Sequence, residues 1–287
     1  MTLLEIKKYF REELSELYTD SEASVLSSVF LEKITGFSTR QLRRLLHQEM
    51  LADDVGKIKD ILAQLKTGKP YQHILGEAEF YGRTFKVSKN VLIPRPETEE
   101  LVEIAITEIK NSPLFSGRKN FRVLDIGTGS GIIPVTIKCK FPEAEVSAVD
   151  ISQEALDVAR HNAETHQTKI RFIQSDFLEE TTNEVWDVII SNPPYIGKEE
   201  ENEISDGVKK FEPLTALFSP VDDPLIFYRK IAETATRHLS DNGMIFLEIN
   251  QKFGKETLDL FRQFRFSELI RDLSGNDRFV VVKNEKP

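Results

Sequence analysis

Apolar residues recur at helical spacing through the first 70 positions of the chain, and charged residues separate them. The pattern predicts helices over residues 3–17, 21–35 and 52–66, and a shorter helix that begins after Ser38 as its N-cap. This segment carries no strand pattern and no cluster of reactive side chains. We therefore expect residues 1–75 to form a small helical bundle, a kind of domain that often recognises a partner.

After the helical segment, the pattern changes to two short runs of β-forming residues around a glycine. These runs flank Gly82 and predict a β-hairpin, so residues 76–93 are expected to form a connector. Two prolines then force an extended segment around Arg95, before a helix with an acidic first turn. An ordinary helix start explains the glutamates of Glu97-Thr98-Glu99, whereas the roles of Arg95 and of that segment beyond a helix start stay open.

From Phe121 onward, strand patterns alternate with helix patterns. Short apolar runs predict strands over residues 121–126, 144–149, 169–173, 186–190, 243–249, 266–273 and 278–282. Helical spacing predicts helices over residues 131–140, 152–165, 224–239 and 253–264. Alternation of this kind produces a parallel sheet that is covered on both faces. We expect residues 94–287 to form an α/β domain of the Rossmann-like type, with a mostly parallel seven-stranded sheet.

Composition and charge exclude several classes of protein. The 287 residues suffice for one or two domains, and their net charge of −9 argues against a protein that coats nucleic acid or an anionic membrane. The single cysteine, Cys139, allows no internal disulfide, and the five histidines show no metal-ligand spacing, so we expect no metal site. No signal-peptide order and no run of ~18 apolar residues is present. We expect a cytoplasmic protein that does not engage a membrane.

A glycine-rich turn joins the first strand of the α/β domain to its helix. Its sequence is Asp125-Ile126-Gly127-Thr128-Gly129-Ser130-Gly131. Glycines let the backbone turn sharply and approach a ligand closely. A dinucleotide-binding turn would carry its third glycine at Ile132, so a cofactor without pyrophosphate fits better. S-adenosylmethionine is the obvious candidate, because its cationic groups would give Asp125 a purpose; a merely structural turn is the alternative.

Acidic residues follow the next two strands. Asp150 can accept both hydroxyls of a ribose in a fork geometry, although a helix N-cap would also place an aspartate there. Asp176 and Phe177 suit an adenine, with hydrogen bonds to its edge and apolar contact with its face, and a plain aspartate turn is the rival interpretation.

The fourth strand ends in Asn192-Pro193-Pro194-Tyr195. The two prolines end the strand, because neither donates to a ladder, and they leave the asparagine at the carboxyl edge of the sheet, where ligands bind. A polar side chain, a free backbone carbonyl and an aromatic ring suit a planar group that bears N–H bonds. The alternative is a Pro-Pro turn that only ends a strand.

In this order, these motifs resemble the class I S-adenosylmethionine-dependent methyltransferases. More narrowly, the chain resembles the release factor glutamine methyltransferases, which methylate the side-chain amide of the glutamine in the Gly-Gly-Gln loop of class 1 peptide chain release factors. The narrower resemblance rests on the helical N-terminal domain and on four further segments: Gly76-Glu77-Ala78-Glu79-Phe80-Tyr81-Gly82, Ile93-Pro94-Arg95-Pro96-Glu97-Thr98-Glu99, Phe211-Glu212-Pro213 and Asp277-Arg278. One departure is Asn250, where the family pattern leads us to expect a glycine.

The resemblance implies a role for each motif. The Asn192 side-chain oxygen and the Pro193 carbonyl would accept the two N–H bonds of the substrate amide, and Pro194 and Tyr195 would complete the substrate site. The cofactor would contact Gly127, Thr128, Gly129, Ser130, Gly131, Asp150, Phe177 and Asn192. The helical domain would dock on the release factor, and we expect a monomer that binds no nucleic acid.

Three alternatives stay open on the sequence alone. A DNA or RNA methyltransferase that acts on an exocyclic amino group of adenine or guanine would use the same Asn-Pro-Pro-Tyr turn on a flipped base, but the acidic charge disfavours it. A cofactor-binding adaptor without catalysis would have no use for this turn. A nicotinamide oxidoreductase conflicts with the glycine spacing.

Overall fold

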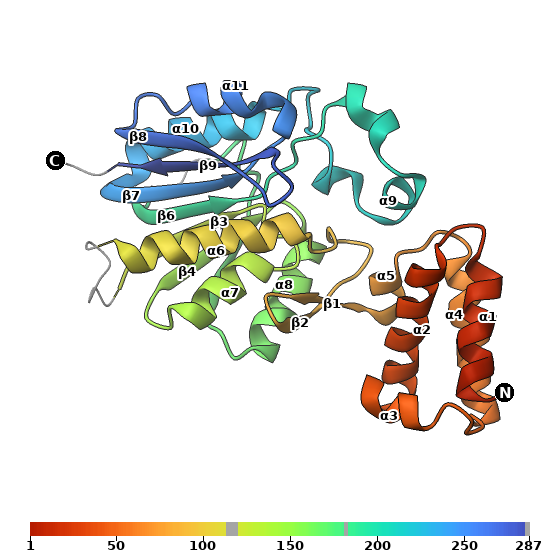
Figure 1. The fold of residues 1–287 in the computed structure, drawn as a ribbon. Coiled ribbons are helices and arrows are strands. Elements are labelled where there is room, and N and C mark those ends of the chain that lie inside the picture. Colours follow the sequence, from red (N-terminus) through yellow and green to blue (C-terminus); the bar gives the residue numbers. More distant parts are fainter. Residues whose placement is uncertain (113–119, 181–182, 285–287) are drawn as a thin grey trace. The chain divides into compact units, whose positions relative to one another are not determined.

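The computed structural model of the chain describes residues 1–112, 120–180 and 183–284. The chain divides into two compact units (Figure 1). The first unit comprises Met1–Leu75 together with Asp206–Phe211, and the second comprises Gly76–Ser205 and Glu212–Pro287.

The first unit is all-helical. Its helices are α1 (Leu3–Leu14), α2 (Asp20–Thr35), α3 (Thr39–Arg44), α4 (Ala52–Leu65), α5 (Tyr71–Leu75) and α9 (Asp206–Phe211). The sequence patterns predicted α1 to α4, and the helical N-terminal region is confirmed. Helix α2 begins one residue earlier than predicted, because Thr19 forms a capping box with Glu22. The pattern missed α5 and α9, which are too short to show a period.

The second unit is built on a seven-stranded sheet of order β5-β4-β3-β6-β7-β9-β8. The strands are β3 (Arg122–Ile126), β4 (Glu145–Asp150), β5 (Ile170–Gln174), β6 (Trp186–Ser191), β7 (Leu239–Glu248), β8 (Phe266–Arg271) and β9 (Asp277–Lys283). Strands β3 to β7 pair in parallel, and β9 pairs antiparallel with both β7 and β8. The predicted mostly parallel sheet of seven strands is confirmed.

Helices cover both faces of this sheet, and they form two hydrophobic clusters with it. Helices α6 (Pro96–Asn111), α7 (Ile132–Lys140) and α8 (Gln153–Thr165) lie on one face, and α10 (Ile226–His238) and α11 (Gly254–Asp259) lie on the other (Figure 1). Alternate strand residues belong to opposite clusters: Val123 packs with α6 and α7, and Leu124 packs with α10.

The largest departures from the predicted boundaries in this unit concern one helix and one strand. The predicted helix over residues 253–264 ends at Asp259, although Phe261 and Phe264 continue its apolar spacing and are buried under the sheet. Strand β7 begins at Leu239 rather than at Gly243. An added Cβ at Gly243 would lie 2.6 Å from the side chain of Leu239, which would have to shift to admit a larger residue.

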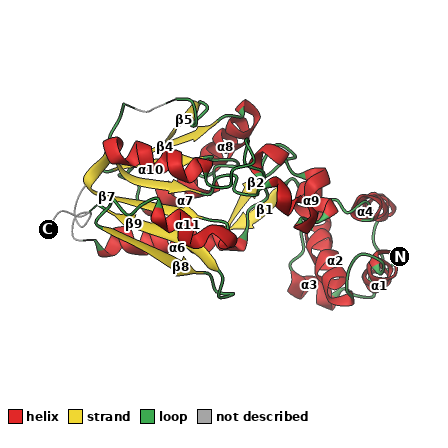
Figure 2. Cartoon of the chain, turned by 90° about the horizontal axis from the view of Figure 1, so that it is seen from above, coloured by secondary structure: helices red, strands yellow, loops and turns green. Residues whose placement is uncertain are grey.

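The predicted hairpin is formed by β1 (Glu77–Phe80) and β2 (Arg83–Lys86), and it lies beside α8 (Figure 2). The buried side chain of Asn162, on α8, connects the hairpin to the glycine-rich turn. Its Oδ1 accepts from the Lys86 N–H at 2.7 Å, and its Nδ2 donates to the carbonyls of Lys86 at 3.0 Å and Ser130 at 2.8 Å. The hairpin thus helps to position the turn.

The order of the strands places a crevice beside β3. The chain proceeds from β3 outward to β4 and β5, and then returns to β6 on the other side of β3. At such a switch point the loops after neighbouring strands diverge and leave a ligand site at the carboxyl ends. Within residues 1–112, 120–180 and 183–284, no helix is both long and apolar enough to cross a membrane.

Replacing Gly131 with alanine should lower the free energy of unfolding by about 1–3 kcal/mol. Gly131 has a φ of +78°, and an added Cβ would lie 2.9 Å from Ala159 Cβ on α8. Gly129→Ala is the matched control, because its φ of +53° is also positive but an added Cβ meets nothing within 4 Å. Urea denaturation measures both variants. Equal losses of stability would contradict a packing role for Gly131.

Candidate active site

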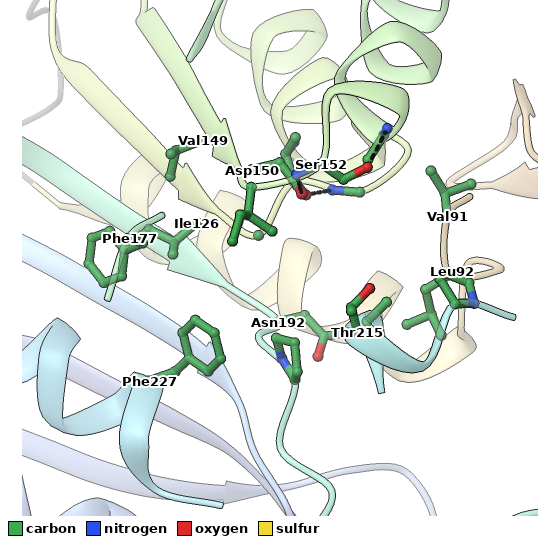
Figure 3. Close-up of a pocket in the computed structure, with 18 of the residues that line it drawn as sticks. Val91, Leu92, Ile126, Val149, Asp150, Ser152, Phe177, Asn192, Thr215 and Phe227 are labelled. Carbon is green, nitrogen blue, oxygen red and sulfur yellow. Dashed lines mark hydrogen bonds between the residues drawn. The ribbon is translucent and has the colours of Figure 1, made fainter. Parts of the chain in front are cut away.

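A pocket of about 630 Å³ opens at the carboxyl ends of the parallel strands of the second unit. Nine residues predicted for the site line it, from four separate loops: Gly127, Thr128, Gly129, Ser130, Asp150, Asp176, Phe177, Asn192 and Pro194. Figure 3 shows Asp150, Phe177 and Asn192 around this pocket. Gly131, Pro193 and Tyr195 do not belong to its lining; they adjoin lining residues in the chain.

The carboxylate of Asp150 is tied to the glycine-rich turn. Its Oδ2 accepts from the Gly129 N–H at 2.8 Å, and its Oδ1 accepts from the Ser152 N–H at 2.9 Å. Burial raises the pKa of Asp150, and these two backbone N–H groups act in the opposite direction. The N-cap of α8 is Ser152, so the N-cap interpretation of Asp150 does not hold.

Asp125 is fully buried at the end of β3, just before the turn. Both of its carboxylate oxygens are buried, and so is the hydroxyl of Thr128 beside them. Burial raises the pKa of Asp125 to about 7, and a hydrogen bond from the Thr128 hydroxyl acts in the opposite direction. Buried polar atoms beside a pocket are costly unless a neighbouring group, a ligand or water satisfies them.

The pocket has apolar walls that include residues the sequence patterns missed. In Figure 3, the rings of Phe177 and Phe227 lie on one side, and Val91 and Leu92 lie on the other. Phe227 stands outside the buried stripe of α10, which comprises Tyr228, Ile231, Ala232, Thr234 and Ala235. An aromatic residue outside the buried stripe of a helix is a sequence feature that could have indicated a pocket residue. Val91 and Leu92, in a loop without a period, gave none.

The side chain of Asn192 is hydrogen-bonded to a buried network. Asn192 Nδ2 donates to Thr98 Oγ1 at 3.0 Å, and the Thr98 hydroxyl donates to Glu248 Oε2 at 2.8 Å. The Tyr195 hydroxyl donates to the other oxygen of Glu248 at 3.2 Å. Burial raises the pKa of Glu248 to about 7. Burial also raises the pKa of Tyr195, and the negative charge of the neighbouring Glu248 raises it further.

Arg95 connects two segments of the resemblance that are far apart in sequence. Its Nη2 donates to Glu212 Oε1 at 2.7 Å, and the Ile93 N–H donates to Glu212 Oε2 at 3.0 Å. Glu212 is buried. The loop after β6, which lines the pocket through Pro213 and Thr215, is therefore anchored to the segment before α6.

Besides interacting with the helix dipole, glutamates at the start of α6 accept hydrogen bonds from neighbouring segments of the chain. Glu99 Oε1 accepts from the Tyr81 N–H of the hairpin at 2.8 Å, and Glu100 Oε2 accepts from the Leu273 N–H at 3.0 Å. Pro96 occupies the first helical turn, as predicted.

Asn250, where a glycine was expected, supports the Asn-Pro-Pro-Tyr turn. Its Nδ2 donates to the Tyr195 carbonyl at 3.2 Å and to Glu200 Oε1 at 2.8 Å, and its Oδ1 accepts from the Lys252 N–H.

Comparison with known proteins defines the class first. A family model described as "Methyltransferase small domain" matches residues 109–208, and one described as "PrmC N-terminal domain" matches residues 5–76. A solved methyltransferase from Pyrococcus furiosus shares the fold, with a TM-score of 0.50, 19% identity and coverage of 78% of this chain and 98% of that one. A Thermus thermophilus 16S rRNA N2 G1207 methyltransferase gives a TM-score of 0.50 and 20% identity, over 73% of this chain and 50% of its own. The fold is that of a methyltransferase.

Closer relatives give the family. The release factor glutamine methyltransferase of Flavobacterium psychrophilum is 42% identical over 96% of this chain and 98% of its own length. That of Streptococcus pneumoniae is 42% identical over 98% of each chain, and that of Bacillus subtilis 37% identical over 98% of this chain and 97% of its own. The chain belongs to the release factor glutamine methyltransferase family, as its motifs predicted, and the nucleic-acid alternative is not favoured.

Proposed function

We propose that this protein transfers a methyl group from S-adenosylmethionine to the side-chain amide nitrogen of the glutamine in the Gly-Gly-Gln loop of class 1 release factors. The observation that carries the proposal is the place of Asn192, at the carboxyl end of β6, on the wall of the pocket that the glycine-rich turn and Asp150 also line. A group that suits a planar amide thus lies next to a site that suits a nucleoside.

The residues of the pocket fit S-adenosylmethionine. Its volume of about 630 Å³ lies within the usual range of ligand sites. Asp150 offers carboxylate lone pairs toward ribose hydroxyls, and Phe177 and Phe227 offer apolar surface to a base. Glycines 127 and 129 leave open space where side chains would stand. A bound cationic group would favour the ionised form of Asp125, whose pKa burial raises to about 7.

The chemical demand on the chain is mainly one of positioning. An amide nitrogen is a poor nucleophile, because its lone pair is delocalised into the carbonyl. S-adenosylmethionine, when bound, supplies a methyl group that is already strongly electrophilic. Well-oriented reactants gain on the order of 7–11 kcal/mol over a bimolecular encounter, whereas one hydrogen bond to a buried group contributes about 1–3 kcal/mol. Orientation therefore dominates, and each hydrogen bond contributes a share of it.

Asn192 and Pro193 would provide this orientation. The Asn192 side-chain oxygen and the Pro193 carbonyl would accept the two N–H bonds of the substrate amide, which turns the nitrogen lone pair toward the methyl group and increases electron density on it. Tyr195 would pack against the amide or the neighbouring glycine backbone. The C–N bond would form as the methyl–sulfur bond breaks, and the nitrogen would then lose one proton to solvent water. A dedicated base is not required, because that proton becomes acidic once the new bond has formed.

The first unit would dock on the release factor, and we expect the reaction to take place in the cytoplasm, where translation takes place. Neither role changes the chemistry at Asn192.

Methyl incorporation tests this function. Purified protein with methyl-labelled S-adenosylmethionine should label a class 1 release factor, and a release factor whose loop glutamine is replaced with alanine should stay unlabelled. DNA and ribosomal RNA are the competing acceptors. Label in nucleic acid and none in the release factor would contradict the proposal.

A further inference from the structure

We propose that Thr98 and Glu248 are positioning residues, which hold the Asn192 amide with its oxygen toward the substrate so that the site accepts a glutamine amide and rejects a carboxylate. This inference rests on the proposed methyl transfer to glutamine. It assigns a task to two buried residues that do not touch the reacting atoms.

The direction of the hydrogen bonds follows from the donors that each group has. An ionised Glu248 carboxylate only accepts, and it receives the Thr98 hydroxyl at 2.8 Å. Thr98 has a single hydroxyl proton, which is used in that bond, so its oxygen can only accept from Asn192. The group of Asn192 at 3.0 Å from Thr98 must therefore be Nδ2, and the oxygen Oδ1 is left for another partner.

The network is shielded from water, which would otherwise accept or donate in either direction. Thr98 and Glu248 are each 2% exposed, and Asn192 is half-buried; Thr98 and Asn192 both line the pocket. No residue in the described part of the chain donates to Asn192 Oδ1. Asn192 Oδ1 is thus a hydrogen-bond acceptor on the pocket wall, and the buried Thr98 and Glu248 hold the amide that carries it. Such an acceptor suits a ligand that presents an N–H group.

Four elements maintain this arrangement. Glu248 ends β7, Thr98 lies in the first turn of α6, and Asn192 follows β6. The Tyr228 hydroxyl of α10 donates to the Glu248 carbonyl at 2.9 Å and holds the backbone in place. The second carboxylate oxygen of Glu248 accepts from the Tyr195 hydroxyl, so one carboxylate supports both ends of the Asn-Pro-Pro-Tyr turn.

Selectivity follows from the orientation. A glutamine amide presents N–H donors, which Asn192 Oδ1 can accept. A glutamate carboxylate presents only acceptors, so one of its oxygens would face Asn192 Oδ1 with no proton between them. Both oxygens would then lack a hydrogen-bond donor, which is costly for buried groups. If the Asn192 amide turned over, its NH₂ group would face the substrate, oppose the glutamine N–H bonds and favour a carboxylate instead.

The network also predicts a dependence on pH. Burial raises the pKa of Glu248 to about 7; the Thr98 and Tyr195 hydroxyls and Arg278 lower it, Glu97 raises it, and Tyr228 also faces it. Above that pH the carboxylate accepts from both hydroxyls. As the pH falls through about 7, the protonated carboxyl becomes a donor, one hydroxyl loses its acceptor, and the orientation of Asn192 is no longer enforced. The transfer rate should therefore fall toward acid pH. We expect Glu248→Gln to be slow at every pH and its pH–rate profile to lack this fall on the acid side.

The decisive variants are Thr98→Val and Thr98→Ser. Thr98→Val should lower kcat by about tenfold or more, while Thr98→Ser stays within about threefold of wild type and both bind S-adenosylmethionine within about threefold. Inhibition by a release factor whose loop glutamine is replaced with glutamate reports selectivity, and the preference for glutamine over glutamate should fall about tenfold in Thr98→Val only. Thr136→Val is the matched control, because Thr136 is buried on α7 and its hydroxyl bonds to its own helix.

A second readout needs no substrate. In NMR spectra of protein labelled at asparagine, the Asn192 side-chain NH₂ should be protected from hydrogen exchange in wild type and Thr98→Ser, and lose that protection in Thr98→Val. Wild-type kcat and selectivity in Thr98→Val, or an unprotected NH₂ in wild type, would overturn the inference. If the wild-type protein fails to methylate a release factor, the proposed function falls, and the NMR result still decides whether Thr98 orients Asn192.

Discussion

Asn192→Ala should slow methyl transfer by about tenfold or more at saturating cofactor and release factor. The variant removes the oxygen that would accept a substrate N–H, and the nitrogen then samples orientations that do not face the methyl group. The affinity for S-adenosylmethionine, measured by calorimetry, should stay within a few-fold, because Asp150, Phe177 and the glycine-rich turn are unchanged.

Asn192→Asp is the informative companion variant. It keeps a side-chain oxygen but has no N–H to donate to Thr98 Oγ1, so it should also be slow. Wild-type turnover of the alanine variant would contradict the role of Asn192 in holding the amide. Full activity of the aspartate variant alone would show that the oxygen suffices without the bond to Thr98.

Asp150→Ala should weaken the binding of S-adenosylmethionine by about tenfold or more, because hydrogen bonds to a charged group contribute about 1.5–3 kcal/mol each. The variant removes the proposed ribose contacts and also releases the Gly129 and Ser152 N–H groups that the carboxylate accepts. At saturating cofactor the transfer rate should recover, which separates this variant from Asn192→Ala.

Calorimetry measures this loss, with Asp157→Ala as the control. Asp157 lies on the exposed side of α8 and pairs with Arg160. Unchanged affinity in Asp150→Ala would remove the ribose assignment. An equal loss in Asp157→Ala would point to a general effect on α8 instead.

Much of the fold and of the pocket was predictable, for a common physical reason. Each strand of the parallel sheet is a short apolar run, and the polar residues that follow it reach the same edge. Gly129, Asp150, Phe177 and Asn192 were predicted for the site one loop at a time, and the strand order brings their loops together around one pocket.

The residues behind the pocket were harder to predict. Arg95 and Glu212 are 117 positions apart, and no local pattern in one sequence pairs them. Thr98 was explained as part of a helix start, and it does lie in the first turn of α6. Its hydrogen bond to Asn192 was therefore not predicted. Glu248 did give a signal, since a carboxylate between Leu247 and Ile249 in an apolar strand needs buried partners.

The most direct test of the account is mass spectrometry of a release factor after incubation with the purified protein and S-adenosylmethionine. We predict that the tryptic peptide with the Gly-Gly-Gln loop gains the mass of one methylene unit, that fragmentation locates the gain on the glutamine side chain, and that Asn192→Ala produces it much more slowly. A gain on another residue, or no gain on this peptide while the cofactor is consumed on another acceptor, would contradict the account.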